Sequence, residues 1–310
     1  MDITDILTDL RSNRIKKVIV DSDTANEMDD QYAIAYAIAL DKAKKIDLLS
    51  INAAPFGNCD DFKDKVRASY DEIVRILDAT ETFGDYPVYE GSESSITATN
   101  APIDSPAAQN IIKTALESDE LVYILALGAC TNIASAIMLE PSIKEKICVV
   151  WLAGHTFSYG HAREYNINQD FKAGQYLFDS GVALLQMPAF GGGTEVLKVT
   201  FIMLESMLSK DTSACKFFGR QLPGEFKAPI DPSAESFEKN YETWQRVLWD
   251  IAAPGVLSHP EAFDLLIVPT PVITDNGDYI FDETRHKEIY MNSVDPDVIV
   301  CDALSYIAGL

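Results

Sequence analysis

Short apolar segments alternate with helix-like segments along the first two thirds of this 310-residue chain, and this alternation constrains the fold most. Each apolar segment is rich in Val, Ile and Leu and predicts a buried strand. The segments are 18–20, 48–51, 122–127, 148–152 and 182–185, and helical patterns cover 30–44, 62–79, 106–117, 131–139 and 170–179. Because such alternation implies right-handed βαβ units, we predict an α/β fold with an open, mainly parallel, doubly wound sheet.

The rest of the chain is less regular. A hydrophobic content of 47% without a compositional break favours one large domain over 1–310. A polar, proline-containing stretch at 221–240 predicts a loop or lid, and 241–256 predicts a helix. Residues 265–280 predict two strands joined near Asp275-Asn276-Gly277-Asp278, a sequence typical of a hairpin turn.

Four aspartates follow the first apolar segment, and they are Asp21, Asp23, Asp29 and Asp30. The first pair ends the predicted strand and the second opens the next helix, so one turn gathers several carboxylates. Water, a helix N-terminus or a cation must compensate this charge, and a divalent metal does so most fully. Alternatively, Asp29 and Asp30 are ordinary first-turn acids and Asp23 is a cap. Two clustered pairs favour a calcium or magnesium site, because ligands in open α/β sheets bind at strand C-termini.

Other polar residues follow the remaining predicted strands, and parallel strands would bring them to the same edge of the sheet. They are Gly57-Asn58, Gly128-Ala129-Cys130-Thr131-Asn132, Gly154-His155 and Glu164-Tyr165-Asn166-Ile167-Asn168-Gln169-Asp170. These carboxylates, amides and threonine suit a hard cation and a polyhydroxylated ligand such as a sugar, and they suit phosphate poorly. Taken singly, each of these residues also has a structural explanation. Thr131-Asn132 can be the N-cap of the next helix, and Asn166 or Asn168 can be a turn residue.

Composition excludes several classes of partner. The formal net charge of −23 at pH 7 argues against binding to nucleic acid or to an anionic membrane. The five cysteines are widely spaced and never form Cys-x-x-Cys, a pattern typical of free thiols in a reducing cytosol. The N-terminus lacks the basic start and apolar stretch of a secretion signal, and no segment approaches the roughly 20 apolar residues that span a bilayer. We therefore expect a cytoplasmic protein.

Other catalytic motifs fit poorly. Asp21-Ser22-Asp23 is similar to the haloacid-dehalogenase phosphatase signature, but that pattern has threonine or valine where this chain has Ala25, and no later Gly-Asp-x-x-x-Asp follows. Gly191-Gly192-Gly193-Thr194 lacks the lysine and spacing of a phosphate loop, and it predicts a flexible turn. A Ser-His-Asp triad is unsupported, since the chain has no Gly-x-Ser-x-Gly elbow.

Five blocks of the sequence resemble the nucleoside hydrolases, also called the inosine-uridine preferring nucleoside hydrolases, in order and approximate spacing. The blocks are Asp21-Ser22-Asp23 with Asp29-Asp30, then Gly57-Asn58, then 127–134, then Glu164-Tyr165-Asn166, and finally Trp249-Asp250. The resemblance covers most of the chain. It implies a calcium-dependent N-ribohydrolase that cleaves the bond between ribose and a nucleobase, commonly as a homodimer or homotetramer.

The resemblance also implies the roles of individual residues. Calcium would be held by Asp23, Asp30, the main-chain carbonyl of Thr131 and Asp250, and would also bind the ribose 2′- and 3′-hydroxyls and a water. Asp23 would act as general base on that water. The ribose would be held by Asp29, Asn58, Glu164 and Asn166. The developing oxocarbenium charge would be stabilised by these carboxylates.

Trp249 stands where many family members have a histidine that protonates the leaving base. An aromatic residue here resembles the purine-preferring branch, in which stacking raises the basicity of the ring nitrogen, so the resemblance favours purine ribonucleosides. The alternative is that Trp249 packs in the core with Leu248 and Ile251.

The chain departs from the family pattern in two places. Five residues, 24–28, separate Asp23 from Asp29, where the usual pattern has three, and a longer turn could carry Asn26 or Glu27 into the pocket. Residues 91–110 contain no aromatic, although the purine-preferring branch has a second stacking ring there; Phe56, Tyr159 or Tyr165 could replace it. Two alternatives therefore stay open, a hydrolase of another ribosylated compound and a catalytically silent protein that binds calcium or ribose.

Overall fold

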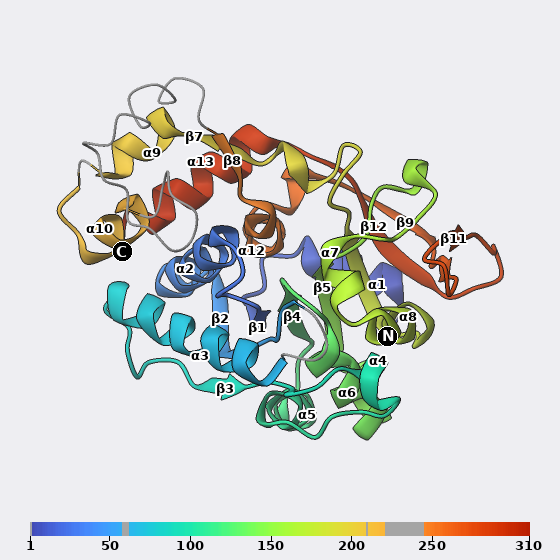
Figure 1. The fold of residues 1–310 in the computed structure, drawn as a ribbon. Coiled ribbons are helices and arrows are strands. Elements are labelled where there is room, and N and C mark those ends of the chain that lie inside the picture. Colours follow the sequence, from blue (N-terminus) through green and yellow to red (C-terminus); the bar gives the residue numbers. More distant parts are fainter. Residues whose placement is uncertain (1, 58–61, 209, 221–244) are drawn as a thin grey trace.

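The computed structural model describes residues 2–57, 62–208, 210–220 and 245–310. Its centre is an eight-stranded sheet in which all neighbouring strands run parallel except the last pair (Figure 1). In spatial order the strands are β3 (Val88–Glu90), β2 (Ile46–Ala53), β1 (Lys16–Ser22), β4 (Val122–Ala126), β5 (Ile147–Leu152), β6 (Ala183–Met187), β12 (Lys287–Val294) and β9 (Phe263–Pro269). The predicted open, mainly parallel α/β sheet is confirmed, as are all five predicted strands.

Helices cover both faces of this sheet. The helices of the described residues are α1 (Ile3–Leu10), α2 (Met28–Lys42), α3 (Phe62–Ala79), α4 (Ile96–Thr99), α5 (Pro106–Glu117), α6 (Thr131–Leu139), α7 (Tyr165–Gln169), α8 (Phe171–Asp179), α9 (Phe201–Leu208), α10 (Ser213–Arg220), α12 (Ala252–Ser258) and α13 (Pro296–Ile307). The five helices predicted from the sequence correspond to α2, α3, α5, α6 and α8 and are confirmed. None of the described helices is long and apolar enough to cross a membrane.

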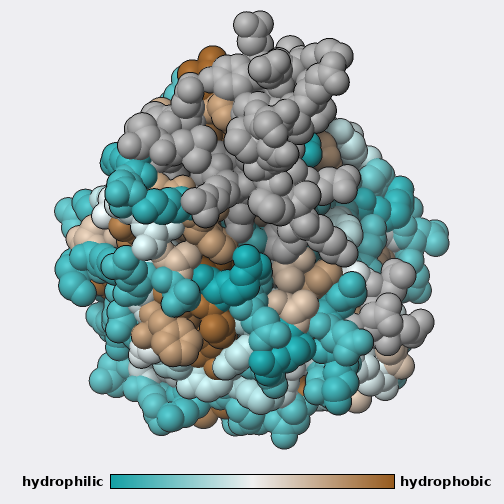
Figure 2. Space-filling view, turned by 60° about the vertical axis from the view of Figure 1, so that its left-hand side comes forward, coloured by the Kyte–Doolittle hydropathy of each residue, from teal (hydrophilic) through white to brown (hydrophobic). Residues whose placement is uncertain are grey.

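The period-two alternation of β1 divides the core into two layers. Val18 and Val20 face one cluster of buried side chains, which includes those of α2, α12 and α13. Ile19 faces the opposite cluster, formed with α5, α6 and α8. A strand buried on both faces explains why the parallel strands are nearly continuous apolar runs. On the outer face drawn in Figure 2, apolar residues show in small patches between hydrophilic ones.

The C-terminal third differs from its prediction in part. Residues 245–256 are not one helix, because β8 (Gln245–Val247) pairs antiparallel with β7 (Lys198–Thr200) before a 3₁₀ turn at Trp249–Ile251 and then α12. The predicted hairpin is present as β10 (Val272–Ile273) and β11 (Tyr279–Ile280), but the sequence did not predict that the preceding segment, β9, pairs with β12. The predicted loop or lid at 221–240 and residues 241–244 lie outside the described residues.

The strand order reverses direction between β1 and β4. Chain segments after β1 lead away to β2 on one side, whereas those after β4 lead to β5 on the other. At such a switch point the loops leaving the two central strands diverge, and ligands of open α/β sheets bind in the resulting crevice. The aspartate-rich turn after β1 and the turn that precedes α6 both leave the sheet at this point.

Candidate metal centre

Three buried carboxylates converge beside the switch point. Asp29 and Asp30 lie in the first turn of α2, and Asp250 lies in the 3₁₀ turn that precedes α12. One carboxylate oxygen from each lies within 4.8 Å of the others, and all three side chains are buried. Oδ1 of Asp250 has no hydrogen-bond partner among the described residues. Hard oxygen ligands with an unsatisfied buried atom fit a calcium-like cation, which accepts six to eight oxygens.

Asp23 adjoins these three residues from the turn after β1. Its Oδ2 accepts a hydrogen bond of 3.3 Å from Nε2 of Gln169, the last residue of α7. Gly128 leaves space for this carboxylate, since a Cβ there would lie 2.5 Å from Asp23 Oδ1. The carboxylate of Asp23 is therefore held by residues from two other loops of the sheet.

Burial dominates the electrostatics of this cluster. It raises the pKa of Asp23 to about 8, with repulsion from Asp29 adding to the shift. Burial, and to a smaller extent the charge of Asp30, raises the pKa of Asp29 well above its ordinary value. The pKa of Asp30 is raised in the same way by burial and by the charge of Asp23. Burial, and to a smaller extent the charges of Asp29 and Asp30, also raises the pKa of Asp250 well above its ordinary value. These buried like charges need protons or a cation.

Asp21 stands behind the cluster as a structural residue. Its Oδ2 accepts a bond of 3.1 Å from Asn132 Nδ2, and the same amide lies 3.3 Å from the carbonyl of Ala53 at the end of β2. Asn132 Oδ1 in turn accepts bonds from the N–H and hydroxyl of Ser92. Asn132 therefore ties the C-terminal ends of β1 and β2 to the loop after β3 and is not the helix N-cap that its sequence position allowed.

Thr131 and Asp170 form a second structural contact. Thr131 is the first residue of α6, and its hydroxyl donates to Asp170 Oδ2 over 2.8 Å. Asp170 also accepts the N–H groups of Ile96 and Thr97 at 2.8 Å each. Thr131 is completely buried beside the turn that carries Gly128. Asn58, a predicted ribose contact, lies outside the described residues.

Glu164 and Asn166 join the ends of neighbouring strands at α7. Glu164 caps α7 by accepting the N–H of Asn166 at 2.6 Å, and it also accepts the N–H of Gly154 at 3.0 Å. Burial raises the pKa of Glu164 to about 7. The amide of Asn166 donates to the carbonyls of Leu127 and Leu152, at 2.8 and 3.1 Å. Asn166 therefore bridges the ends of β4 and β5 and is no simple turn residue.

The extended turn at 24–28 folds over the cluster. Thr24 points inward and is fully buried, with its hydroxyl 2.6 Å from that of Ser22. Asn26 Oδ1 accepts a bond of 3.0 Å from the hydroxyl of Tyr165, whose side chain is half exposed. Glu27 is the N-cap of α2 but makes no capping hydrogen bond. The extra residues thus link the acidic turn to α7.

Trp249 lies in an aromatic group next to the acidic cluster. It is only partly buried, unlike its neighbours Leu248 and Ile251, so it is not a core residue of the same kind. Its ring contacts that of Phe190, with centroids 4.8 Å apart, and Phe190 contacts His155 at 5.5 Å. These three rings form an aromatic wall, which Trp249 joins at the residue before Asp250.

Three residues at this site were not assigned roles from the sequence. Gln169 and Gly128 both lie inside the quoted sequence blocks, so their position was visible although their contacts with Asp23 were not. Phe190 follows β6 and gave no sequence signal, because its contact with Trp249 joins residues far apart in the chain.

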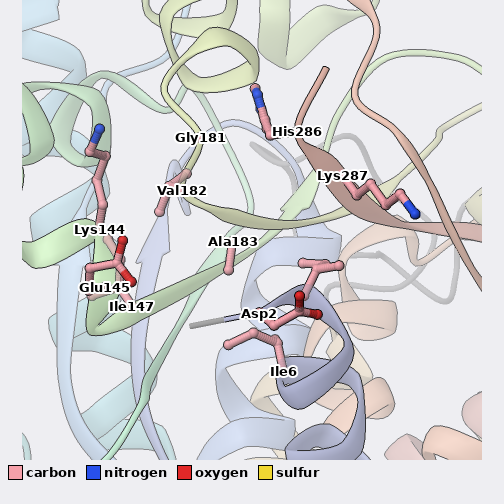
Figure 3. Close-up of a pocket in the computed structure, with 11 residues that line it drawn as sticks. Asp2, Ile6, Lys144, Glu145, Ile147, Gly181, Val182, Ala183, His286 and Lys287 are labelled. Carbon is pink, nitrogen blue, oxygen red and sulfur yellow. The ribbon is translucent and has the colours of Figure 1, made fainter. Parts of the chain in front are cut away.

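A separate cavity lies at the opposite edge of the sheet. Figure 3 shows it where β5, β6 and β12 begin, with Lys144, His286 and Lys287 around it. The acidic cluster lies at the strand ends. This cavity therefore takes no part in the candidate centre.

A parallel sheet with buried carboxylates at its switch point defines an α/β protein with a candidate metal centre. Residues 18–304 match the sequence profile described as inosine-uridine preferring nucleoside hydrolase. Because the match covers nearly the whole chain, the protein belongs to this family.

Individual relatives are more distant. The pyrimidine-specific ribonucleoside hydrolase RihB of Escherichia coli strain SE11 is 29% identical over 197 residues, which cover 56% of this chain and 59% of that protein. The matched region thus spans less than two thirds of this curated relative. The structure of a purine-preferring ribonucleoside hydrolase from Gardnerella vaginalis matches with a TM-score of 0.73 at 22% identity, covering 95% of this chain and 98% of the other. A plant nucleoside hydrolase matches with a TM-score of 0.71 at 18% identity, over 96% of this chain and 100% of the other. At these identities the structural matches show a shared fold.

Proposed function

We propose that this protein is a calcium-dependent N-ribohydrolase that converts ribonucleosides, with a preference for purines, to ribose and free base. The observation that carries the proposal is the convergence of buried Asp29, Asp30 and Asp250, in a member of the nucleoside hydrolase family. Asp30 and Asp250 would hold the metal with Asp23 and the carbonyl of Thr131, while Asp29 would bind the ribose and lies close enough to ligate as well. When bound, calcium would orient the ribose diol and lower the pKa of a water.

The chain's own residues supply the remaining chemistry. Asp23, held by Gln169 and confined by Gly128, accepts the proton of the attacking water. The carboxylate of Glu164, whose position is fixed by backbone N–H groups, stabilises the positive charge that develops on the sugar ring. Asn166 Oδ1 accepts one bond from Gln169 and retains a lone pair for a ribose hydroxyl. Asn58 is retained as a ribose contact from the family resemblance alone.

The purine preference rests on the aromatic wall. Trp249 directly precedes Asp250 and meets Phe190 in an edge-to-face contact, and a purine presents more surface for stacking on such rings than a pyrimidine. The names of the relatives do not decide the base preference, since one is pyrimidine-specific and another is purine-preferring. We expect kcat/KM for inosine to exceed that for uridine about tenfold, the equivalent of about 1.4 kcal/mol of stacking.

Release of reducing ribose from a panel of purine and pyrimidine nucleosides tests this function. Turnover should disappear with a chelator, return with Ca²⁺, and be lost in Asp23→Ala, while the control Asp71→Asn, an exposed carboxylate on α3, should keep full activity. Retained calcium and ribose binding without any turnover would instead identify a silent binding protein. Ribose release only from a non-nucleoside riboside would favour the other open alternative.

Trp249→Ala tests the leaving-group role. Stacking matters for expelling a poor leaving group, so the variant should lose purine turnover far more than turnover of nitrophenyl riboside, whose leaving group is already good. Equal losses on both substrates would contradict a role for Trp249 in leaving-group activation.

A cytoplasmic location and a homodimeric or homotetrameric state belong to the same proposal. The described cysteines Cys130, Cys148, Cys215 and Cys301 are unpaired, which supports a reducing compartment. Fractionation of cells and light scattering of the purified protein test these two points.

A further inference from the structure

A polar network joins α2, α13 and the C-terminal end of α12. At its centre is Asp302 of α13, which accepts hydrogen bonds from the hydroxyl of Tyr36 and, at 3.3 Å, from that of Ser258. His259 Nε2 lies 3.1 Å from the other oxygen of Asp302, and its Nδ1 lies 2.9 Å from Glu261. Tyr36 comes from α2, whereas Ser258 and His259 both come from the end of α12.

The helices that meet at this network also carry the acidic cluster. Asp29 and Asp30 open α2, and Tyr36 lies on the same helix about 9 Å further along its axis. Asp250 precedes α12, and Ser258 and His259 end it. α13 packs against both helices, and Figure 1 shows the three close together. The two ligand-bearing segments thus approach each other at the carboxylates and are joined through Asp302 further along both helices.

Burial and hydrogen bonds hold the side chains of this network in a fixed arrangement. Tyr36 is fully buried, so its hydroxyl has no alternative partner in water, and the Asp302 side chain is only 17% exposed. Burial alone would lower the pKa of His259, but its bonds to Glu261 and Asp302 outweigh this and raise the pKa above the ordinary value. Loss of one donor therefore leaves a largely buried carboxylate undercompensated, which strains the contact between the helices.

We infer that Asp302, with Tyr36, Ser258 and His259, is a positioning network that sets the spacing between α2 and α12 and thereby the calcium affinity of the acidic cluster. None of these residues touches the cluster, so all are positioning residues. This inference rests on the proposed metal centre. The physical basis is that metal affinity depends on how closely the ligands are held at their binding separation.

Tyr36→Phe is the first test, with Tyr86→Phe as the matched control. Both substitutions remove a hydroxyl that donates to an aspartate, but the hydroxyl of Tyr86 bonds to Asp41 at 2.7 Å, at the far end of α2 and outside the Asp302 network. By calorimetric titration with Ca²⁺, Tyr36→Phe should bind about tenfold more weakly and Tyr86→Phe should match wild type. A lower Tm of Tyr36→Phe in chelator with unchanged calcium affinity would overturn the inference, because it would leave the hydroxyl a purely structural role.

His259→Asn supplies a second readout through pH. The charged and titratable groups that face His259 are Glu261 beside it and Asp302 from α13, with Tyr36 and Tyr306 next to Asp302. The protonated ring of His259 bridges two carboxylates and so stabilises the network. This stabilisation is fully present below the pKa of His259 in the unfolded chain, and it is lost as pH rises through the raised pKa of His259 in the folded protein. The ratio of wild-type to His259→Asn calcium affinity should therefore fall toward one as pH rises from below the ordinary histidine pKa of about 6.5 through the raised pKa of His259.

The outcomes separate the two proposals. A ratio that does not change with pH would overturn the role of His259. Wild-type protein that binds calcium, with both variants binding equally well, would contradict the network alone. Wild-type protein that binds no calcium would contradict the metal centre, and the network inference with it.

Discussion

At the scale of single residues, two buried aspartates of this protein have opposite surroundings. Asp170 accepts hydrogen bonds from Ile96, Thr97 and Thr131, so its charge is well compensated. Asp250 has an oxygen without a partner among the described residues and faces two other carboxylates. Asp170 therefore stabilises the fold, whereas Asp250 needs a ligand from outside the chain.

Asp250→Asn should therefore stabilise the metal-free protein and abolish stabilisation by calcium. Removing one of several buried like charges relieves their repulsion and so increases the free energy of unfolding. In chains somewhat shorter than this one, each kcal/mol of added stability raises Tm by about 2–4 °C. Thermal unfolding with chelator and with excess Ca²⁺ measures both effects.

Asp170→Asn is the contrasting variant. It should lower stability by about 1–3 kcal/mol with or without calcium, since the amide cannot accept all the present donors. If Asp250→Asn lost stability in chelator as Asp170→Asn does, the Asp250 side chain would have a structural role like that of Asp170.

Gly128→Ala should damage the centre without disturbing the fold. Its Cβ would lie 2.5 Å from Asp23 Oδ1, so the carboxylate must move away from its position. We expect calcium affinity to fall about 10–100-fold, as when an outer partner of a ligand is lost. Gly174→Ala on α8 is the control, because its Cβ would meet no atom closer than 3.4 Å. Equal calcium affinity in both variants would show that Asp23 is free to shift.

At the scale of secondary-structure elements, the β10–β11 hairpin supports the loop after β5. The hydroxyl of Tyr279 donates to the carbonyl of His155 at 3.0 Å and accepts a bond from Gln186 at 3.1 Å. The N–H of Gly154, in the same loop, holds Glu164. A remote hairpin thus fixes the orientation of a proposed ribose contact.

Tyr279→Phe should cost about 1–3 kcal/mol of unfolding free energy and should raise KM for nucleosides more than it lowers kcat. Urea unfolding and steady-state kinetics measure the two effects. Tyr290→Phe is the control, since its hydroxyl accepts a longer bond of 3.4 Å from the N–H of Phe157. An unchanged KM in Tyr279→Phe would show that the loop holds Glu164 without the hairpin.

The sequence predicted elements better than their partners. The turn at 274–278 identified the hairpin because turn residues act locally, and Gly277 has the positive φ of 79° that the turn requires. The pairing of β9 with β12 joins segments across an intervening hairpin, and no local pattern encodes it. The sequence assigned residues 241–256 to one helix because the apolar pattern did not show that β8 would pair with β7.

At the scale of the whole molecule, the buried acids couple stability to pH. Burial raises the pKa of Asp21 and Glu164 to about 7 and that of Asp23 to about 8, whereas unfolded carboxyls titrate near pH 4. Between these limits the metal-free folded protein binds more protons than the unfolded chain. Its stability should therefore fall as pH rises from about 5 to about 8, by up to about 1.4 kcal/mol per pH unit for each such group.

Excess calcium should weaken or reverse this trend, because the ion binds the ionised carboxylates. Tm measured across this pH range in chelator and in calcium tests the prediction. Asp250→Asn in chelator should show a shallower decline than wild type. A metal-free Tm that rises with pH would show that the carboxylates are already compensated by groups within the protein.

The sequence by itself determined the five strands β1, β2, β4, β5 and β6, the helices α2, α3, α5, α6 and α8, and the presence of Asp23, Asp29 and Asp30 at one turn. These features depend on side-chain periodicity and on residues close together in the chain, which local physical chemistry governs. Its prediction that the sheet is mainly parallel and open also held.

Only the tertiary structure decided which distant groups meet. It brought Asp250 to within 4.8 Å of Asp29 and Asp30, Gln169 to Asp23, and Phe190 to Trp249. These contacts depend on how α2 and α12 pack against each other and on the sheet order, which no local pattern specifies. The physical reason is that side-chain convergence is set by long-range packing, whereas strand and helix formation are set largely within each segment.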